Sequence, residues 1–513
     1  MFDKLRSLLS FDRPARLLAV FVAVTSVLWV LQASLLQNIL PLDAVEAVVW
    51  GDQLQWGQMK SPPLSGWLAA AFWHLSGRGD WSLYLLEALT NAVGLWFVYK
   101  LAREFMDEAE SATATLLLCF LYYYNPPAMK FCSHSTQIAL LPAMTLHFVR
   151  ALRGGKWKDW ILLAVFSALA MLGKYSAAQL LIAFAAVMLA TRTGRKRLLT
   201  PGPYLCAALF LALLAPHIVW LFDHDFLAIK HMDERMRAEG AMWYLPFLDF
   251  GILLYPFLNS AVGLAVGMLP WRKDRLERRK TDKEALAILL PVAVIPPGIY
   301  VLLSACGQAL ILQWFSYLAF PAGIVTMLLW PYRCGRREFK HLFLLLNFCI
   351  VILLIATTID VMAKPRFKIH SEPDDIVAAG EAFWKRHGNG RPLEVVFGDR
   401  WLAGVMELYA PGHPSACDGR DICTWELVRE RAKKNGMLLV YQHHIPAGSE
   451  FWPNMRPEGV EDGGHIVRFR ARFGKTKKKE IRFAYVPPED TPRKSDRKPA
   501  EAADGGREPV ARY

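Results

Sequence analysis

The sequence has few charged residues. Of its 513 residues, 20% are Asp, Glu, Lys or Arg, whereas 54% are hydrophobic, and the mean hydropathy is +0.22. This composition is too apolar for an ordinary soluble protein. The apolar residues are clustered in runs long enough to cross a bilayer. The sequence therefore predicts an α-helical multi-pass membrane protein.

Two further absences narrow the functional classes. We find no internal repeat, and the apolar runs are nearly uncharged apart from Glu87. A secondary transporter or lipid flippase typically has inverted repeats and charged residues near the middle of its spans. The acidic residues of this sequence instead cluster in the loops. This pattern disfavours a transporter.

About eleven spans are expected, and charge indicates their orientation. With the N-terminus inside, the inside loops carry far more Lys and Arg than the outside loops, as the positive-inside rule requires. The net charge of +13 is then mostly a signal of topology and indicates no nucleic-acid partner. The expected spans lie near 17–40, 81–99, 111–124, 135–149, 159–173, 176–191, 203–222, 246–270, 284–305, 309–330 and 341–361.

An odd number of spans puts the C-terminal region outside. Residues 1–362 form the predicted membrane domain and 363–487 a small α/β domain, with helices expected over 372–388 and 424–436. Strands are expected over 392–397 and 437–442, and a hairpin is expected to follow them. GDRWLAG (398–404) is interpreted as a polar turn after a strand. Residues 488–513 are charged, rich in Pro and Gly, and predicted to be disordered.

Two of the eight cysteines form a candidate disulfide. Cys417 and Cys423 lie six residues apart in the external domain, where an oxidising compartment would allow a bond between them. The spacing is not that of a zinc knuckle.

The first outside loop, within 41–80, holds the residues best suited to catalysis. Asp43, Glu46 and Trp50 have the spacing i, i+3, i+7, which puts them on one face of a helix. Lys60 follows, just before Pro62-Pro63, which stops a preceding helix and suits the first turn of the next. Two carboxylates, a cation and a rigid turn make a plausible catalytic loop. The alternative is a solvated amphipathic segment.

Later outside loops supply further cations. Lys130 and His134 are four residues apart and share a face if their segment is helical. Lys174 lies in the tight turn LGKYS (172–176), where it is either an anchor at a span end or a phosphate ligand. Arg235 either binds phosphate or pairs with neighbouring acids in the loop 216–240. The His and Asp residues of that loop fit no specific metal site, and a divalent metal is left open.

The order of these segments resembles the GT-C fold glycosyltransferases that use polyprenyl-phosphate sugars. This superfamily includes protein O-mannosyltransferases, the lipid A aminoarabinose transferase and rhizobial galacturonosyltransferases. Asp43 and Glu46 after the first span, then PPLSGWL, AMKF (128–131), LGKYS and PHIVWLFDHDF (216–226), follow the pattern of the bacterial branch. The similarity is good over roughly residues 15–230 and weak beyond.

The resemblance implies roles for several residues. Asp43 corresponds to the catalytic base, and Glu46 to an acidic neighbour that positions the acceptor or a metal. Lys174 corresponds to the lysine that neutralises the carrier phosphate. Lys60 is offset by one from the usual position before the prolines, because Ser61 stands there. The segment CSHSTQ (132–137) departs from the Asn-rich or acidic pattern, so no second catalytic acid is expected in it.

The chemistry is consistent without the family. A sugar phosphoester needs its anionic leaving group stabilised, and Lys60, Lys130, Lys174 and Arg235 are the outside cations available, with Trp50 and His134 beside them. A carboxylate must take the proton of the acceptor hydroxyl as the bond to the sugar forms. No nucleotide-binding loop is present, which agrees with a lipid-linked donor.

The predicted function is therefore an inverting glycosyltransferase of the bacterial inner membrane. Its N-terminus would be cytoplasmic and its C-terminal domain periplasmic. It would transfer a sugar from a polyprenyl-phosphate donor to lipid A, the lipopolysaccharide core or another envelope glycan. The alternatives are a protein O-mannosyltransferase, a membrane transporter or lipid flippase, and a binding or scaffold subunit that keeps the GT-C fold without catalysis.

Overall fold

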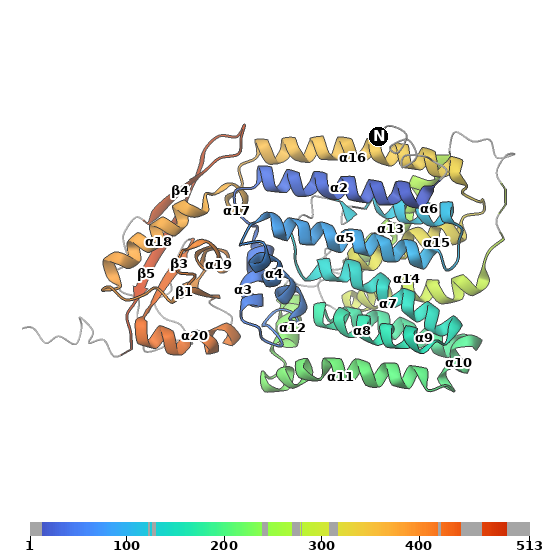
Figure 1. Ribbon diagram of the computed structural model, residues 1–513, viewed down its shortest axis with the longest axis horizontal. Helices are drawn as coiled ribbons and strands as arrows, with labels where there is room; N and C mark the ends of the chain where they lie inside the picture. The colour runs from blue at the N-terminus through green and yellow to red at the C-terminus, as the bar shows by residue number, and fades with distance from the viewer. Residues whose placement is uncertain are drawn as a thin grey trace, which may run out of the picture. The chain divides into compact units, whose positions relative to one another are not determined.

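The chain forms two compact units. The computed structural model describes residues 13–121, 124–125, 130–238, 245–268, 277–278, 280–306, 316–418, 422–442 and 464–489. One unit comprises Met1–Pro373 with Arg468–Lys478, and the other comprises Asp374–Val467 with Lys479–Tyr513. The first unit is helical, whereas the second combines helices with a sheet (Figure 1).

The helical unit is a bundle in which α3 and α4 lie together at one end and α10 at the other (Figure 1). Its helices are α2 (Pro14–Leu36), α3 (Leu42–Asp52), α4 (Leu64–Leu75), α5 (Trp81–Ala102), α6 (Glu108–Leu118), α7 (Ser133–Gly154), α8 (Trp157–Gly173), α9 (Ala177–Ala190), α10 (Arg192–Leu198), α11 (Gly202–Asp223), α12 (Leu227–Ala238), α13 (Leu245–Met268), α14 (Lys283–Ala305), η5 (Ser316–Ala319), α15 (Ala322–Leu329), α16 (Arg336–Ala363) and α17 (Phe367–His370).

Five described helices are long and apolar enough to cross a membrane, which makes the chain a membrane protein. They are α2, α5, α11, α14 and α16, and α9 with α10 would add a sixth span if this pair, bent by 98°, counts as one. The expected count of eleven is therefore not confirmed. The physical reason is visible at α6 and α15, which have 11 and 8 residues. At 1.5 Å per residue these helices extend only about 17 and 12 Å.

These two short helices are apolar because they are buried inside the unit. Every residue of α6 from Ala109 to Leu118 is buried, as are Ala322–Leu328 of α15. The two helices pack closely: a Cβ on Gly323 would lie 2.1 Å from the Ala114 carbonyl oxygen. Each of these two described helices is thus covered by protein and is by itself too short to cross a bilayer.

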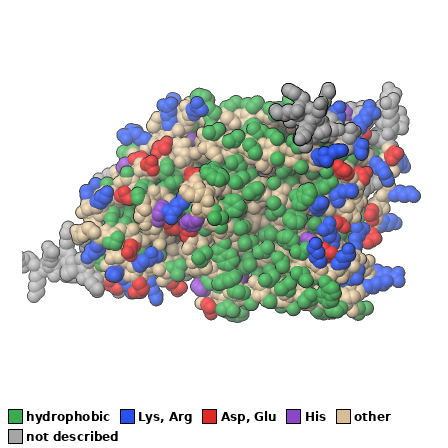
Figure 2. All heavy atoms as spheres, in the orientation of Figure 1, with side chains coloured by type: hydrophobic (Ala, Val, Ile, Leu, Met, Phe, Trp, Pro, Cys, Tyr) green, Lys and Arg blue, Asp and Glu red, His purple; other side chains and the backbone are tan. Residues whose placement is uncertain are grey.

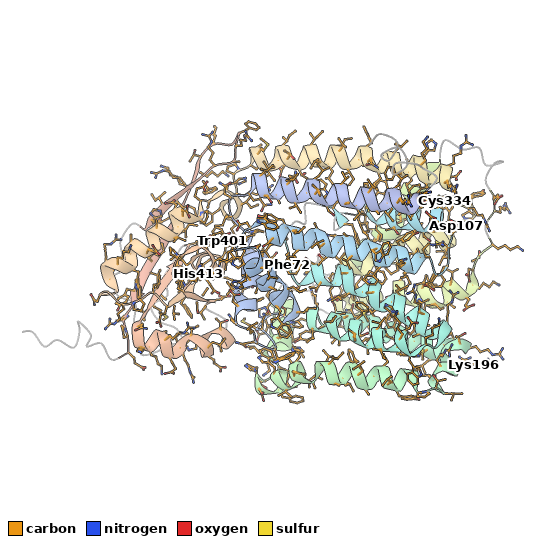
Figure 3. All side chains as sticks on the ribbon, in the orientation of Figure 1. Phe72, Asp107, Lys196, Cys334, Trp401 and His413 are labelled. Carbon is orange, nitrogen blue, oxygen red and sulfur yellow. The ribbon has the colours of Figure 1, made fainter. Side chains whose placement is uncertain are left out.

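Charge is distributed unevenly over the helical unit. Hydrophobic side chains cover the middle of its visible face, and Lys and Arg gather at the end that carries α10 (Figure 2). Lys196 of α10 lies at this basic end, and Phe72 of α4 lies at the opposite end (Figure 3). The α3–α4 pair therefore stands apart from most of the basic residues.

The second unit contains a five-stranded sheet of order β2-β1-β3-β5-β4. Strand β1 pairs in parallel with β2 and β3, and β3 pairs antiparallel with β5. The elements are α18 (Pro373–His387), β1 (Val395–Gly398), α19 (Arg400–Tyr409), β2 (Ser415–Asp418), α20 (Ile422–Asn435), β3 (Met437–Tyr441), β4 (His465–Phe469) and β5 (Lys477–Val486). Apolar residues of β1, β3, β5 and α20 form the core on one face of the sheet.

Sequence patterns located four elements of this unit to within a few residues, namely α18, β1, α20 and β3. The interpretation of 398–404 as a polar turn is wrong, because α19 begins at Arg400. Asp399 caps this helix: its carboxylate accepts hydrogen bonds from the backbone N–H groups of Trp401 and Leu402, each at 3.1 Å. The tail 488–513 lies almost wholly outside the described residues, and its predicted disorder stays a prediction.

Close approach of α3 to α4 depends on a glycine. A Cβ on Gly51 would lie 2.0 Å from the Gly66 carbonyl oxygen and 2.6 Å from the Ala70 Cβ. We expect Gly51→Ala to destabilise the protein by about 1–3 kcal/mol, since overpacking forces the two backbones apart. The measurement is the midpoint of thermal unfolding in detergent. Gly251→Ala is the matched control, because a Cβ there meets nothing within 4 Å. Equal midpoints in the two variants would contradict the argument.

Candidate active site

Helix α3 presents the two predicted carboxylates. It begins after Pro41, whose backbone is extended, and carries Asp43 in its first turn, where a negative charge is favoured by the helix dipole. Glu46 and Trp50 follow on the same helix and are buried, at 5% and 7% exposure. The Asp43 side chain keeps 30% of its surface exposed. The predicted helical face is thus present, with Asp43 at its accessible end.

Lys60 pairs with the buried carboxylate. Its Nζ lies 2.7 Å from Glu46 Oε2, and it stands 5.7 Å from the centre of the Trp50 ring. A carboxylate as buried as that of Glu46 needs such a partner, because an uncompensated charge there would be costly. The segment that follows α3 thus turns back, so that Lys60 contacts α3. Helix α4 begins directly after Pro63.

Lys130 pairs with the second carboxylate, across more than eighty residues of sequence. Its Nζ lies 2.9 Å from Asp43 Oδ2, and 42% of the lysine side chain is exposed. Lys130 and His134 would share a face only if their segment were helical, and that condition is not met, because α7 begins at Ser133. Cys132 caps this helix in an extended conformation, with Ser135 bonded back to its N–H at 3.1 Å. Lys130 is therefore free of the helical geometry and reaches α3.

Lys174 lies in the predicted tight turn between α8 and α9, beside His134. Its Nζ donates to His134 Nε2 at 3.0 Å and lies 5.4 Å from the centre of the Tyr317 ring. Tyr317 packs edge-on against His134 and donates to Ser176 Oγ at 2.9 Å. Gly173 permits this arrangement, since a Cβ there would lie 2.5 Å from Thr136 Oγ1 of α7.

His134 lies within reach of the charges of all three lysines. Burial, and then the positive charges of Lys174, Lys130 and Lys60, lower the pKa of His134 well below its ordinary value. The imidazole is therefore neutral at pH 7 and can accept the hydrogen bond from Lys174. The same electrostatic effect indicates that the lysines from three separate loops surround one small region.

The structure thus brings together most of the residues predicted for the site. Two carboxylates on α3 pair with two ammonium groups, and a third ammonium group, that of Lys174, lies against His134 and Tyr317. Such a cluster can hold an anion on its lysines and offer a carboxylate as a base. We name it the α3 cluster: Asp43, Glu46, Trp50, Lys60, Lys130, His134, Lys174 and Tyr317.

Residues 216–240 do not form the expected loop. Most of them belong to α11 and α12, because Pro216 lies inside α11 without ending it. His217 is buried and contacts the Trp56 carbonyl oxygen at 2.6 Å and the Tyr175 hydroxyl at 3.1 Å. The side chain of Arg235 lies outside the described residues, so its predicted role stays a prediction. In the part of the chain that is described, no three His, Cys, Asp or Glu side chains could together hold a metal ion.

Two residues in this region, Glu87 and Tyr317, were not predicted from the sequence as part of the site. Glu87 of α5 is 2% exposed, and Asn91 Nδ2 donates to its Oε1 at 3.1 Å. Its position inside an otherwise uncharged apolar run, 81–99, was the available signal. Tyr317 carried no signal, because nothing in its local sequence connects it to the turn at Lys174.

The predicted disulfide is not tested. Cys417 is buried on β2, where its thiol donates to the Asp418 carbonyl oxygen at 3.5 Å. The side chain of Cys423 lies outside the described residues, so the bond stays a prediction.

The fold belongs to the GT-C class of membrane glycosyltransferases. ArnT from Cupriavidus metallidurans has a similar fold, with a TM-score of 0.56 for the crystal structure bound to undecaprenyl phosphate and 0.58 for the apo state. Each match covers 91% of this chain and 97% of ArnT at 12% sequence identity.

Sequence comparisons point to the same class. The profile of the family described as dolichyl-phosphate-mannose-protein mannosyltransferase matches residues 60–220. The lipopolysaccharide core galacturonosyltransferase RgtB of Rhizobium johnstonii is 24% identical over 385 residues, covering 73% of this chain and 77% of RgtB. RgtA of the same organism is 24% identical over 421 residues, covering 78% and 82% of the two chains. The predicted resemblance is confirmed: the protein is a GT-C glycosyltransferase.

The lowered pKa of His134 predicts a pH dependence of stability. The unfolded chain binds a proton near pH 6.5, whereas the folded protein does so only at lower pH, so stability falls as the pH drops below about 6.5. We expect His134→Gln to remove this part of the loss, measured as a smaller drop in the thermal unfolding midpoint between pH 7.5 and 5.0. The exposed His413 supplies the control variant His413→Gln; an identical drop in wild type and His134→Gln would contradict the prediction.

Proposed function

We propose that this glycosyltransferase transfers a sugar from a polyprenyl-phosphate donor to lipid A, the lipopolysaccharide core or another envelope glycan, with inversion at the sugar carbon. The observation that carries the proposal is that Lys60 and Lys130 pair with the two carboxylates of α3, while the charges of these lysines and of Lys174 all act on His134. A lipid-linked phosphate and a sugar hydroxyl are the two groups that such a cluster suits.

The lysines would hold the donor phosphate. Charge-assisted hydrogen bonds from ammonium groups stabilise a phosphate both in the substrate and as it departs. Lys130 and Lys174 are the cations best placed to bind the phosphate, because Lys130 is 42% exposed and Lys174 donates a hydrogen bond to a neutral imidazole. The solved ArnT complex contains undecaprenyl phosphate, which supports a donor of this kind.

Asp43 would act as the base. The acceptor oxygen forms a bond to the sugar C1, the bond from C1 to the phosphate oxygen breaks, and the acceptor proton passes to the Asp43 carboxylate. The leaving group is the polyprenyl phosphate, which carries away the electron pair. One displacement inverts the configuration. When the phosphate draws Lys130 toward itself, Asp43 loses its ion-pair partner and becomes more basic.

Glu46 would position the site. It is too buried to meet the acceptor readily, and its contact with Lys60 at 2.7 Å fixes that lysine beside Trp50. A uronic acid is a fitting sugar, because both curated relatives are galacturonosyltransferases and a sugar carboxylate would need one of the three cations. The rival acceptor is a protein, which the name of the matched family favours.

The expected location is the bacterial inner membrane. The basic end of the helical unit would face the cytoplasm, according to the positive-inside rule. The α3–α4 end would then face the periplasm together with a C-terminal domain over 363–487, which supports an extracytoplasmic site for lipid-linked donors. Residues 1–362 would form the membrane domain.

We expect Asp43→Asn to insert and fold normally but to lose transfer. The amide keeps the shape of the side chain but cannot accept the proton, and removal of a general base costs about 10²–10⁴-fold in rate. The measurement is the mass spectrum of lipid A and core from a deletion strain complemented with wild type or Asp43→Asn.

Asp52→Asn is the matched control, because Asp52 lies on the same helix but pairs with His74 at 2.7 Å. A hexose, pentose or uronic acid increment that depends on Asp43 and not on Asp52 supports the proposal. Full activity of Asp43→Asn would exclude Asp43 as the base. If lipid A and core were unchanged and a protein instead gained a sugar mass that depends on Asp43, a protein would be favoured as the acceptor.

We expect Lys174→Met to weaken the binding of undecaprenyl phosphate about 10–100-fold, since a hydrogen bond to a charged group contributes roughly 1.5–3 kcal/mol. The dissociation constant can be measured on the purified protein in detergent. Lys230→Met serves as the control, because Lys230 is exposed and pairs with Asp225. Equal affinities in the two variants would remove Lys174 from the phosphate site.

A further inference from the structure

The second unit contains a cavity that the transfer reaction does not use. Its volume is about 570 Å³, within the range of about 300–1,000 Å³ that is typical of ligand sites. It lies where the chain enters β1 and β2, between the end of α18 and the exposed face of α20. The residues on which the argument depends are Trp384, Lys385, Arg391, Glu394, His413 and Arg431.

Three cations line this cavity. Arg391 donates to the Tyr485 hydroxyl at 3.3 Å, and Arg431 donates to Ser415 Oγ at 3.1 Å. Within the described residues, neither guanidinium nor the Lys385 ammonium forms an ion pair. Other arginines of the unit behave differently, since Arg429 on the same helix pairs with Glu430 at 3.5 Å. Cations held by neutral partners around a hollow retain their capacity to bind an anion.

The remaining walls suit a sugar. Trp384 is 5% exposed and is held by its indole N–H, which donates to the Arg391 carbonyl oxygen at 2.8 Å. Leu393 and Pro414 add apolar surface for the C–H faces of a pyranose ring. Glu381 and Glu394 supply carboxylates that accept hydrogen bonds from hydroxyl groups. With three cations against two carboxylates, the cavity favours a ligand that is both hydroxylated and negatively charged.

We propose that this cavity binds an acidic saccharide. The ligand class is a short glycan that carries a uronic acid or phosphate group, recognised by Arg391 and Arg431 through its charge and by the apolar and carboxylate walls through its rings and hydroxyls. The turn before β2 borders the site with His413, labelled in Figure 3. Where the proposed function holds, this glycan is the transfer acceptor; that identification alone rests on the proposed function.

The binding test uses the full-length purified protein and three probes: trigalacturonic acid, the neutral trisaccharide maltotriose, and inorganic phosphate. We expect trigalacturonic acid to bind, and its dissociation constant to rise at least about tenfold in Arg431→Gln. Arg429→Gln is the matched control, two residues away on α20, and should bind as wild type does. Thermal unfolding midpoints verify that both variants are folded.

Several outcomes would overturn the proposal. Equal affinity in wild type and Arg431→Gln would place the saccharide elsewhere. Equal binding of maltotriose would remove the need for charge, and phosphate binding as tightly as trigalacturonic acid would reduce the cavity to a simple anion site. Asp43→Asn should bind trigalacturonic acid unchanged, so a failed transfer reaction and an absent saccharide site are distinguishable. If the cavity is the acceptor site of the proposed transfer, we expect Arg431→Gln to raise the KM for the acceptor and to leave the KM for the donor unchanged.

Discussion

Charge compensation at one end of an apolar bundle is the constraint on which this structure depends. Glu46 is nearly inaccessible to water, and a carboxylate in that position is tolerated only with a cation beside it. Lys60 supplies that cation, and Lys130 does the same for Asp43. The two ion pairs connect α3 to Lys60 and to the distant Lys130. They also keep these two lysines close to the carboxylates.

Close backbone contacts bring the charged groups together. The turn after α8 reaches α7 because Gly173 has no Cβ to collide with Thr136, and α3 reaches α4 because Gly51 has none to collide with Gly66. Lys174 and Glu46 owe their positions to these contacts. The histidine between the lysines stays neutral because of burial and of the surrounding positive charge, so it adds a hydrogen-bond acceptor without adding to the repulsion.

The two units carry different chemistry. The helical unit brings two carboxylates together with lysines, as the proposed transfer from a lipid carrier would require. The second unit uses its parallel strands to hold a cavity with arginines, a tryptophan and carboxylates at their entry. In the function that we propose, the first set of cations would bind the donor and the second the acceptor.

Local sequence patterns were sufficient to predict many of the elements and several residues of the α3 cluster. Long apolar runs specify membrane helices, the i, i+3, i+7 spacing specifies the face that carries Asp43, Glu46 and Trp50, and LGKYS specifies a tight turn. Local patterns left open what covers a segment. The helices α6 and α15 are buried by the rest of the unit, and composition cannot distinguish cover by protein from cover by lipid. Asp399 resembled a turn residue because a cap and a turn share the same chemistry.

The α3 cluster also shows which features local sequence determines and which depend on packing. Its acids and lysines were evident from residue type and from their places in the outer loops, since charge beside a membrane is costly without a purpose. Which lysine meets which acid was decided only by packing: Lys130 reaches Asp43 because α7 starts at Ser133, and Tyr317 meets Lys174 from more than 140 residues away. Contacts of this range depend on how whole helices pack, and no short stretch of the chain encodes that packing.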